Sequence, residues 1–289
     1  MTGSPGPFAY DQQEHEAEVA EWRRARLARL TAPDSWLSLV GRFPLREGLS
    51  SAGAAGGCDV VLPPDKSPPE AGTFDRQGTL VRFTPASGVA LSLQRGTGVE
   101  RLADGVAVAL RSDRDGSPDK LALGSLTMEV MERSTELFVR VRDPESPTRR
   151  DFRGLQHYPV DPQWRVVARL EPYDPLKPVE LAYESGGVER YTSPGVAVFD
   201  IAGTTHRVEP VLDGNRQRLY LVFWDETARD TTYGAGRFLY APLPEGGRVL
   251  LDFNQAFSPP CAFTQYAVCP LAPAQNHLAI RVEAGEKRP

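Results

Sequence analysis

The sequence predicts a mainly β protein, made of two packed β-rich units of the sandwich or barrel type and one short N-terminal helix. Its 289 residues exceed the roughly 100 to 200 residues of one typical domain. Beyond residue 33, short apolar runs alternate with Gly, Pro, Asp and Asn, a pattern typical of sandwiches and barrels. One segment near the N-terminus has a helical period instead.

The predicted helix covers residues 11–30. Asp11 and Glu14 have the spacing of a capping box at its start, and Pro33 cannot continue it. Apolar residues recur near a helical period between them, so we expect one face to pack on a sheet, with partner binding as the alternative. These residues are Val19, Trp22, Leu27 and Leu30.

Composition and the positions of proline, glycine and charged residues divide the chain into three parts. Residues 1–10 read as a disordered leader, residues 11–142 as the helix with a sandwich-like unit, and residues 143–289 as a second β-rich unit. The boundary follows from prolines among charges in residues 143–150, which favour a linker. Asp104–Gly105 predicts a tight hairpin turn, because both residue types tolerate positive φ.

Charge and cysteine content exclude several classes of protein. The net charge is −5 and the basic residues are scattered, so the chain lacks the basic face of a nucleic-acid binder. Its apolar runs are too short to span a bilayer, and the N-terminus lacks the pattern of a signal peptide. With three cysteines, we expect free thiols in the cytoplasm and no membrane or nucleic-acid partner. The oligomeric state stays open.

Reactive side chains are densest between residues 225 and 286, where prolines favour loops that a scaffold can present. We expect a small-molecule pocket there. Arg237 would anchor an anion through a bidentate contact, with Tyr233 and Asn254 as polar contacts. If the pocket is catalytic, Asp252 and Cys261 are the candidate acid–base group and nucleophile.

The same segment contains residue types that suit other chemistries. Cys261, Cys269 and His277 are suitable zinc ligands, but no close cysteine pair anchors them, so buried apolar cysteines and no metal are predicted. A cysteine–histidine pair and a pair of carboxylates remain alternatives. The glycines at 234 and 236 lead into a strand, whereas a phosphate-binding loop leads into a helix. No cofactor follows from the sequence.

Short motifs along most of the chain, from about Trp22 to Lys287, resemble the domain of unknown function 1684 family. The resemblance implies that the candidate residues above, with Cys269, lie at motif positions of the family, whose members often have arginine in place of His277. The motifs are Trp22–Arg23, Trp36–Leu37, Leu62–Pro63, Tyr158–Asp161, Trp164–Val166, Thr232–Phe238, Asp252–Asn254, Pro259–Phe263, Cys269–Leu271 and Glu283–Lys287.

Two functions remain open at this point. The first is small-molecule binding or catalysis in the C-terminal pocket. The second is a non-enzymatic protein-interaction module, because the N-terminal half of the family resembles a forkhead-associated β-sandwich. Here, residues 52–59 are mostly alanine and glycine and lack an arginine that could hold a phosphate, which is a departure from that pattern.

Overall fold

The structure, a computed structural model, describes residues 8, 10–133, 136–183 and 186–289. The chain divides into two compact units. The described residues up to Leu30 form one unit with Arg153–Pro289, and Thr31–Phe152 form the other. The sequence grouped the helix with the N-terminal unit and placed the boundary at residue 143, so this division differs at both points. Of the expected leader, only Phe8 and Tyr10 lie among the described residues.

Thr31–Phe152 form a β-sandwich, because buried residues of two sheets share one core that includes Phe74, Phe83, Leu121 and Val139. The six-stranded sheet has the order β1 (Leu39–Leu45), β11 (Glu136–Arg142), β10 (Leu126–Arg133), β9 (Lys120–Leu123), β6 (Ser92–Arg95) and β7 (Gly98–Arg101). The five-stranded sheet has the order β3 (Val60–Val61), β2 (Gly48–Gly53), β4 (Gly72–Gln77), β5 (Leu80–Pro85) and β8 (Val108–Leu110). Short helices are η1 (Trp36–Ser38), η2 (Asp113–Asp115) and α2 (Pro147–Arg150).

The second unit packs two smaller sheets around a core that includes Phe223, Leu251 and Phe253. One sheet has the order β14 (Thr204–Val208), β13 (Val188–Ile201), β12 (Arg165–Ala182) and β18 (Arg248–Asp252). The other contains β15 (Val211–Leu212), β16 (Leu219–Asp225) and β17 (Arg237–Ala241), with β19 (His277–Leu278) parallel to β16. The 3-10 turns are η3 (Pro162–Trp164), η4 (Glu226–Arg229), η5 (Phe253–Gln255), η6 (Pro260–Ala262) and η7 (Ala274–Asn276). The mainly β prediction is confirmed, and among the described residues each sheet is open.

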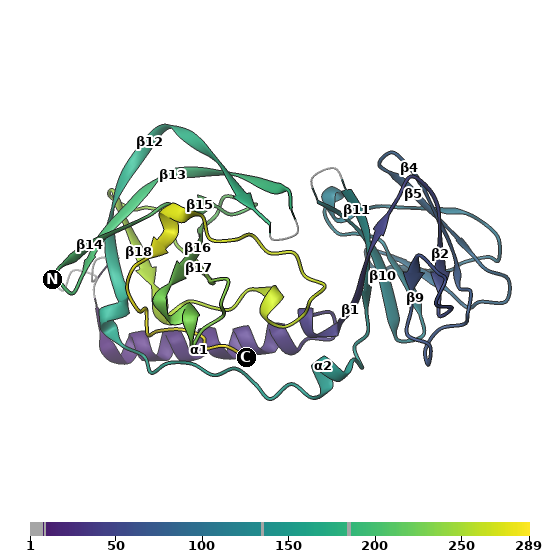
Figure 1. Cartoon of the computed structure of the whole chain (residues 1–289), viewed down its shortest axis with the longest axis horizontal. Helices are drawn as coiled ribbons and strands as arrows, with labels where there is room; N and C mark the ends of the chain where they lie inside the picture. Colours follow the sequence, from purple (N-terminus) through teal and green to yellow (C-terminus); the bar gives the residue numbers. More distant parts are fainter. Residues whose placement is uncertain (1–7, 9, 134–135, 184–185) are drawn as a thin grey trace. The chain divides into compact units, whose positions relative to one another are not determined.

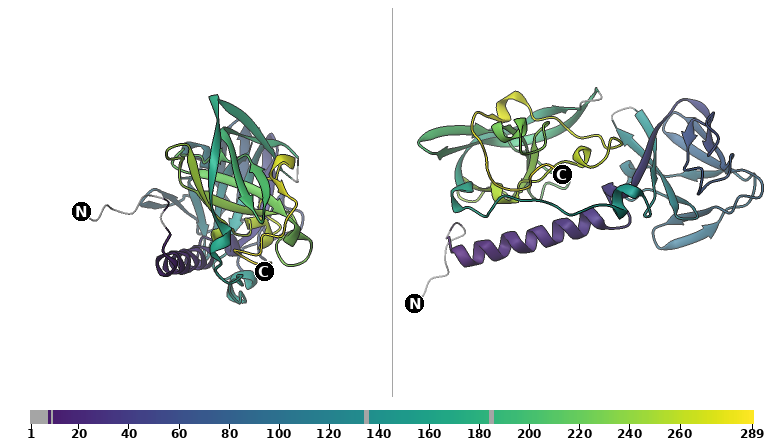
Figure 2. Two further views of the ribbon diagram at one scale, coloured as in Figure 1. Left: turned by 90° about the vertical axis from the view of Figure 1, so that its left-hand side faces the viewer. Right: turned by 60° about the horizontal axis from the view of Figure 1, so that its bottom comes forward.

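The helix α1 (Gln12–Thr31) lies along one side of this second unit (Figures 1 and 2). Its predicted cap is present, since the Glu14 backbone N–H donates to Asp11 at 2.8 Å. The buried face differs from the predicted apolar stripe, because Leu27 is 39% exposed while two basic residues are buried. The buried residues of the helix are His15, Val19, Arg26 and Leu30.

One local prediction was wrong. Asp104–Gly105 forms a turn, but it joins β7 to β8, which belong to different sheets, so it is not a hairpin. The segment predicted as the linker, residues 143–150, directly precedes the boundary between the units at Phe152 and Arg153. Its Asp143 is buried and paired with Lys66 at 2.8 Å, and Ser146 caps α2. No helix in the described part of the chain is long and apolar enough to cross a membrane.

Candidate functional site

A tight turn places Arg237 at the start of β17. The Gly236 N–H donates to the carbonyl of Tyr233, which is half-buried, at 3.0 Å. Gly236 has a φ of 100°, and a Cβ at this position would collide with the carbonyl oxygen of Phe223. Only glycine combines this backbone conformation with such a close approach, so the motif before Arg237 is explained by the turn.

The guanidinium of Arg237 is fully buried and already partnered. Its Nη2 donates to Asp225 Oδ1 at 2.9 Å and to the carbonyl of Val282 at 2.8 Å, while Nη1 donates to the carbonyl of Ala284. The other oxygen of Asp225 accepts from the Val282 N–H at 2.9 Å and from the Thr227 hydroxyl at 2.7 Å. Buried charges persist when they are paired and hydrogen-bonded in this way. The structure therefore gives Arg237 a structural role and does not support the expected anion anchor.

Asp252 and Asn254 meet at the end of β18, in a different cluster. Asp252 Oδ1 accepts from Asn254 Nδ2 at 2.9 Å, and the Asn254 amide also bonds the backbone N–H and carbonyl of Asp161, at 3.0 and 2.9 Å. Asp252 Oδ2 lies 2.9 Å from His15 Nε2 on α1, and both side chains are buried. The side chain of Asn254 thus holds the backbone of Asp161 in place. Asp252 pairs with a histidine that the sequence analysis did not identify as a candidate.

A second helix residue, Arg26, pairs with Glu286 in the same unit. Arg26 Nε donates to Glu286 Oε1 at 2.8 Å, and the Ser258 N–H donates to Oε2 at 2.9 Å. Burial, followed by the positive charges of Arg23 and Arg26, lowers the pKa of the nearby His157 from 6.5 to about 4. His157 is therefore neutral near neutral pH, and Arg26 is matched to a buried carboxylate.

Of the residues considered for a zinc or cysteine–histidine site, the two cysteines lie together, whereas His277 contacts a backbone carbonyl. His277 is exposed and lies 3.2 Å from the carbonyl of Ala272. Cys261 lies instead beside Cys269, whose sulfur accepts the Cys261 backbone N–H at 3.3 Å. Within the described residues, no group of three His, Cys, Asp or Glu side chains could hold a metal ion. The pairs that the structure brings together are Asp252 with Asn254 and Cys261 with Cys269.

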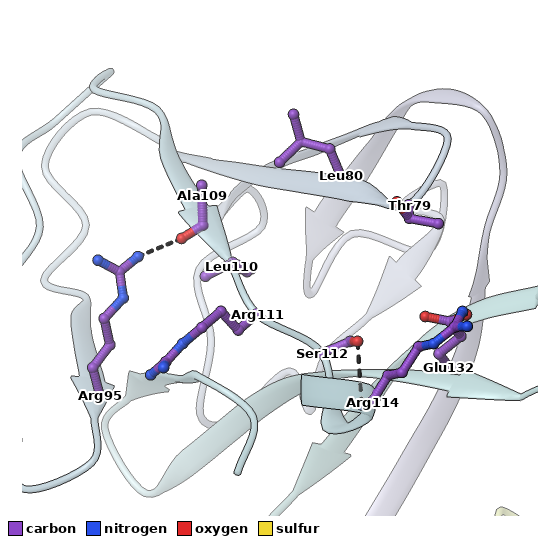
Figure 3. Close-up of a pocket in the computed structure, with 9 residues that line it drawn as sticks. All are labelled: Thr79, Leu80, Arg95, Ala109, Leu110, Arg111, Ser112, Arg114 and Glu132. Atoms are coloured by element: carbon purple, nitrogen blue, oxygen red, sulfur yellow. Dashed lines mark hydrogen bonds and ion pairs between the residues drawn. The ribbon is translucent and has the colours of Figure 1, made fainter. Parts of the chain in front are cut away.

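A cavity of about 720 Å³ lies in the β-sandwich and is rich in arginine. Figure 3 shows Arg95 and Arg111 on one side of it and Arg114 with Glu132 on the other. The arginine side chains are 43%, 54% and 68% exposed, respectively. The full lining is Thr79, Leu80, Arg95, Ala109, Leu110, Arg111, Ser112, Arg114 and Glu132. Three cations thus share the cavity wall with one carboxylate.

A buried carboxylate positions two of these arginines. Asp119 Oδ2 accepts from Arg95 Nε and from the Arg111 N–H, both at 3.0 Å, and Oδ1 accepts from Arg111 Nη2 at 2.8 Å. Burial acts to raise the pKa of Asp119, but the hydrogen bonds from Arg111 and Arg95 outweigh it and leave that pKa lowered. Asp119 is therefore ionised, and it holds both guanidinium groups at the cavity while leaving them partly open to solvent.

The third arginine comes from the 3-10 turn that follows. The hydroxyl of Ser112 accepts the N–H of Arg114 at 3.3 Å and so caps η2. Arg114 pairs with Glu132 of β10. The same loop also lines a second cavity of about 380 Å³, which contains Lys120, Arg140 and Arg142. The segment between β8 and β9 therefore lines both cavities, with Arg111 and Arg114 at the first and Asp113, Ser117 and Pro118 at the second.

Comparison with known proteins places the second unit in a family. A family model described as "Protein of unknown function (DUF1684)" matches residues 150–287. The chain belongs to the DUF1684 family. The resemblance seen in the sequence is thereby confirmed, over a shorter range than the motifs suggested. The DUF1684 region contains Arg237, Asp252 and Asn254, whereas α1 and the arginine cavity lie outside it.

One solved structure that matches is the solution NMR structure of an uncharacterized protein of Haloarcula marismortui. The two chains are 31% identical, and the match covers 50% of this chain and 82% of that chain, with a TM-score of 0.41. A search of curated proteins gave no match. The comparisons therefore assign the DUF1684 family without assigning an activity.

The sequence analysis missed the arginine cavity because its residues come from separate elements. Arg95 ends β6, Arg111 follows β8, and Arg114 lies in η2. Arg111 and Arg114 share a run of charged residues between β8 and β9, which in isolation is typical of a solvated turn, and Arg95 lies outside that run. Outside the DUF1684 region, no motif pointed to these residues.

Proposed function

We propose that the β-sandwich of Thr31–Phe152 is a non-enzymatic binding module for a small anion that carries phosphate or carboxylate groups. The observation that supports it is the convergence of Arg95, Arg111 and Arg114 on one cavity. This proposal moves the anionic ligand from the C-terminal pocket expected from the sequence to the N-terminal sandwich. It also retains the alternative of a non-enzymatic interaction module. Residues 52–59, which lack an arginine, are not part of the proposed anion site.

The chemistry of the cavity suits an anion. A guanidinium presents five N–H donors in a planar fork, a geometry that matches the oxygens of carboxylate and phosphate. The hydroxyls of Thr79 and Ser112 add neutral hydrogen-bonding groups to the wall. Because Asp119 fixes two of the guanidiniums before a ligand arrives, less side-chain entropy is lost on binding. Partial exposure leaves these groups accessible.

The test is a titration of the full chain with pyrophosphate and with citrate, followed by calorimetry and by thermal unfolding. We expect binding, with a rise in Tm that grows with anion concentration and weakens at high salt. Arg114→Gln should weaken binding about tenfold or more, since a hydrogen bond to a charged group contributes roughly 1.5–3 kcal/mol.

The matched control is Arg190→Gln. Arg190 also forms an exposed ion pair, with Glu180 at 3.0 Å, but it lies on β13 of the other unit. This control removes the same charge and should leave anion affinity unchanged. Equal affinities of the two variants would contradict the proposal, as would the absence of any effect of either anion on the wild-type Tm.

A further inference from the structure

The proposed anion site leaves the two cysteines of the C-terminal unit unexplained. Cys261 and Cys269 belong to one loop, and neither forms a disulfide. Cys261 lies in η6 and is half-buried, whereas Cys269 is 8% exposed and directly precedes Pro270, which forms an isolated β-bridge with Tyr183, the residue after β12. One thiol is thus accessible to small molecules, and the other is sheltered behind it.

The two sulfur atoms are within reach of each other. Cys269 Sγ lies 3.3 Å from the backbone nitrogen of Cys261, and the Cys261 sulfur is only three bonds from that nitrogen. Rotation about a single side-chain torsion of Cys261 therefore changes the separation of the sulfurs without moving the backbone. The pKa of the Cys269 thiol is raised, first by a hydrogen bond with the Cys261 side chain and then by burial. The thiol groups therefore already interact in the reduced protein.

We propose that Cys261 and Cys269 are a reversible modification site, at which a hydroperoxide oxidises the two thiols to an intramolecular disulfide. The Cys261 sulfur, as thiolate, attacks the terminal oxygen of the hydroperoxide and the O–O bond breaks. Cys261 becomes a sulfenic acid as hydroxide leaves from hydrogen peroxide, or alkoxide from an organic hydroperoxide. The Cys269 sulfur then attacks the Cys261 sulfur, and the S–O bond breaks. Hydroxide leaves and takes the Cys269 proton as water. Two thiols lose two electrons and, for hydrogen peroxide, two waters form.

The order of the steps follows from burial. Cys261 is more exposed, so it meets the peroxide first. Cys269 is buried and stays a protonated thiol until a sulfenic acid forms beside it, which makes it the resolving cysteine. Closing this short loop should also raise the Tm of the oxidised protein by roughly 5 °C, because a disulfide restricts the unfolded chain.

The test treats the full chain with hydrogen peroxide and counts the thiols that remain after denaturation. Trypsin leaves both cysteines in one peptide, residues 249–281, which has no internal Lys or Arg before its C-terminal arginine. We expect this peptide to become two hydrogen atoms lighter and to resist alkylation, while Cys58 stays reduced. Dithiothreitol should restore its mass. Three reduced thiols after the peroxide treatment, or a disulfide that contains Cys58, would overturn the proposal.

Three variants separate the roles of the cysteines. The control Cys58→Ser should still form the disulfide. In Cys269→Ser, a sulfenic acid should persist at Cys261 and be trapped by dimedone, whereas Cys261→Ser should give little trapped product. Trapping at Cys269 but not at Cys261 would overturn the assigned order. The wild-type peptide masses do not depend on how well the variants fold, so the central claim is tested even if a variant is unstable.

Discussion

Two sets of paired arginines, one in each unit of this protein, differ in the exposure of their side chains. In the C-terminal unit, Arg26 and Arg237 pair with carboxylates whose side chains are 0% and 1% exposed. In the β-sandwich, Arg95 and Arg111 also pair with a buried carboxylate, yet their own side chains are about half exposed. The presence of an ion pair therefore does not separate structural from binding arginines. The exposure of the guanidinium does.

This difference has an energetic basis. Removing one partner of a buried pair leaves an uncompensated charge in a site that water cannot reach. An exposed arginine that loses its partner can turn to water instead, and such pairs contribute little to stability. The following substitutions test the comparison, from the largest expected effect to the smallest.

Asp225→Asn should have the largest effect. It removes the negative charge opposite Arg237 and disturbs the contact with the Val282 N–H. We expect the free energy of unfolding to fall by about 3–5 kcal/mol in urea denaturation. The control Glu283→Gln makes the same chemical change in an exposed pair with Arg281 and should cost less than about 1 kcal/mol. If the two variants are equally stable, Arg237 is not a structural residue.

Asp119→Asn should have an intermediate effect. Its carboxylate is buried, but its partners Arg95 and Arg111 can be solvated. We expect a loss of about 1–3 kcal/mol in the free energy of unfolding, by the same denaturation measurement. A loss as large as that of Asp225→Asn would show that the cavity arginines are as structural as Arg237, and the comparison would fail.

The cations of α1 predict a dependence of stability on pH through His157. Its pKa is about 4 in the folded protein and 6.5 as the usual value, so the unfolded chain binds a proton first as the pH falls. The stability that neutral His157 contributes to the folded protein is therefore fully present above pH 6.5, and it is lost as the pH falls toward 4. Because the side chain is only partly buried, we expect a loss of about 1–2 kcal/mol. Urea unfolding between these pH values should show it in the wild type and not in His157→Gln.

Arg114→Gln should have the smallest effect on stability. Its side chain is 68% exposed, so the change in the free energy of unfolding should stay below about 1 kcal/mol, as for Arg190→Gln. Denaturation of both variants measures it. A larger loss for Arg114→Gln would mean that its weaker anion binding reflects unfolding, and the binding test would then need the other cavity arginines.

Local sequence signals predicted much of the fold. The cap of α1 at Asp11, the turn at Asp104–Gly105 and most strands follow from residue types that act over a few positions. Whether that turn makes a hairpin depends on which sheet each strand joins, and this is not a local property. The mainly β class could be predicted because it depends on local residue patterns. The sheet order could not, because it depends on pairing between distant strands.

The candidate site was harder to predict, because its interactions are long-range. The glycines before Arg237 marked it as a candidate residue, but its partner Asp225 lies 12 residues earlier in the chain and was not predicted to contact it. His15 pairs with Asp252 across 237 residues, so nothing near either residue indicates the contact. The sequence identified Asp252, Asn254 and Cys261 as residues of interest, and only the structure shows what each contacts. The cavity arginines have no shared motif at all.

The division of the C-terminal unit into two separate stretches of chain affects how it can form on the ribosome. The partner of Arg26 lies 260 residues further along the chain, so the nascent helix has no buried carboxylate to meet until synthesis is almost complete. The inserted sandwich has all of its strands by then and can fold first. By the same reasoning, a fragment limited to residues 150–287 would contain Asp252 and Glu286 without their basic partners from the helix. Expression of the family region should therefore include the first 30 residues.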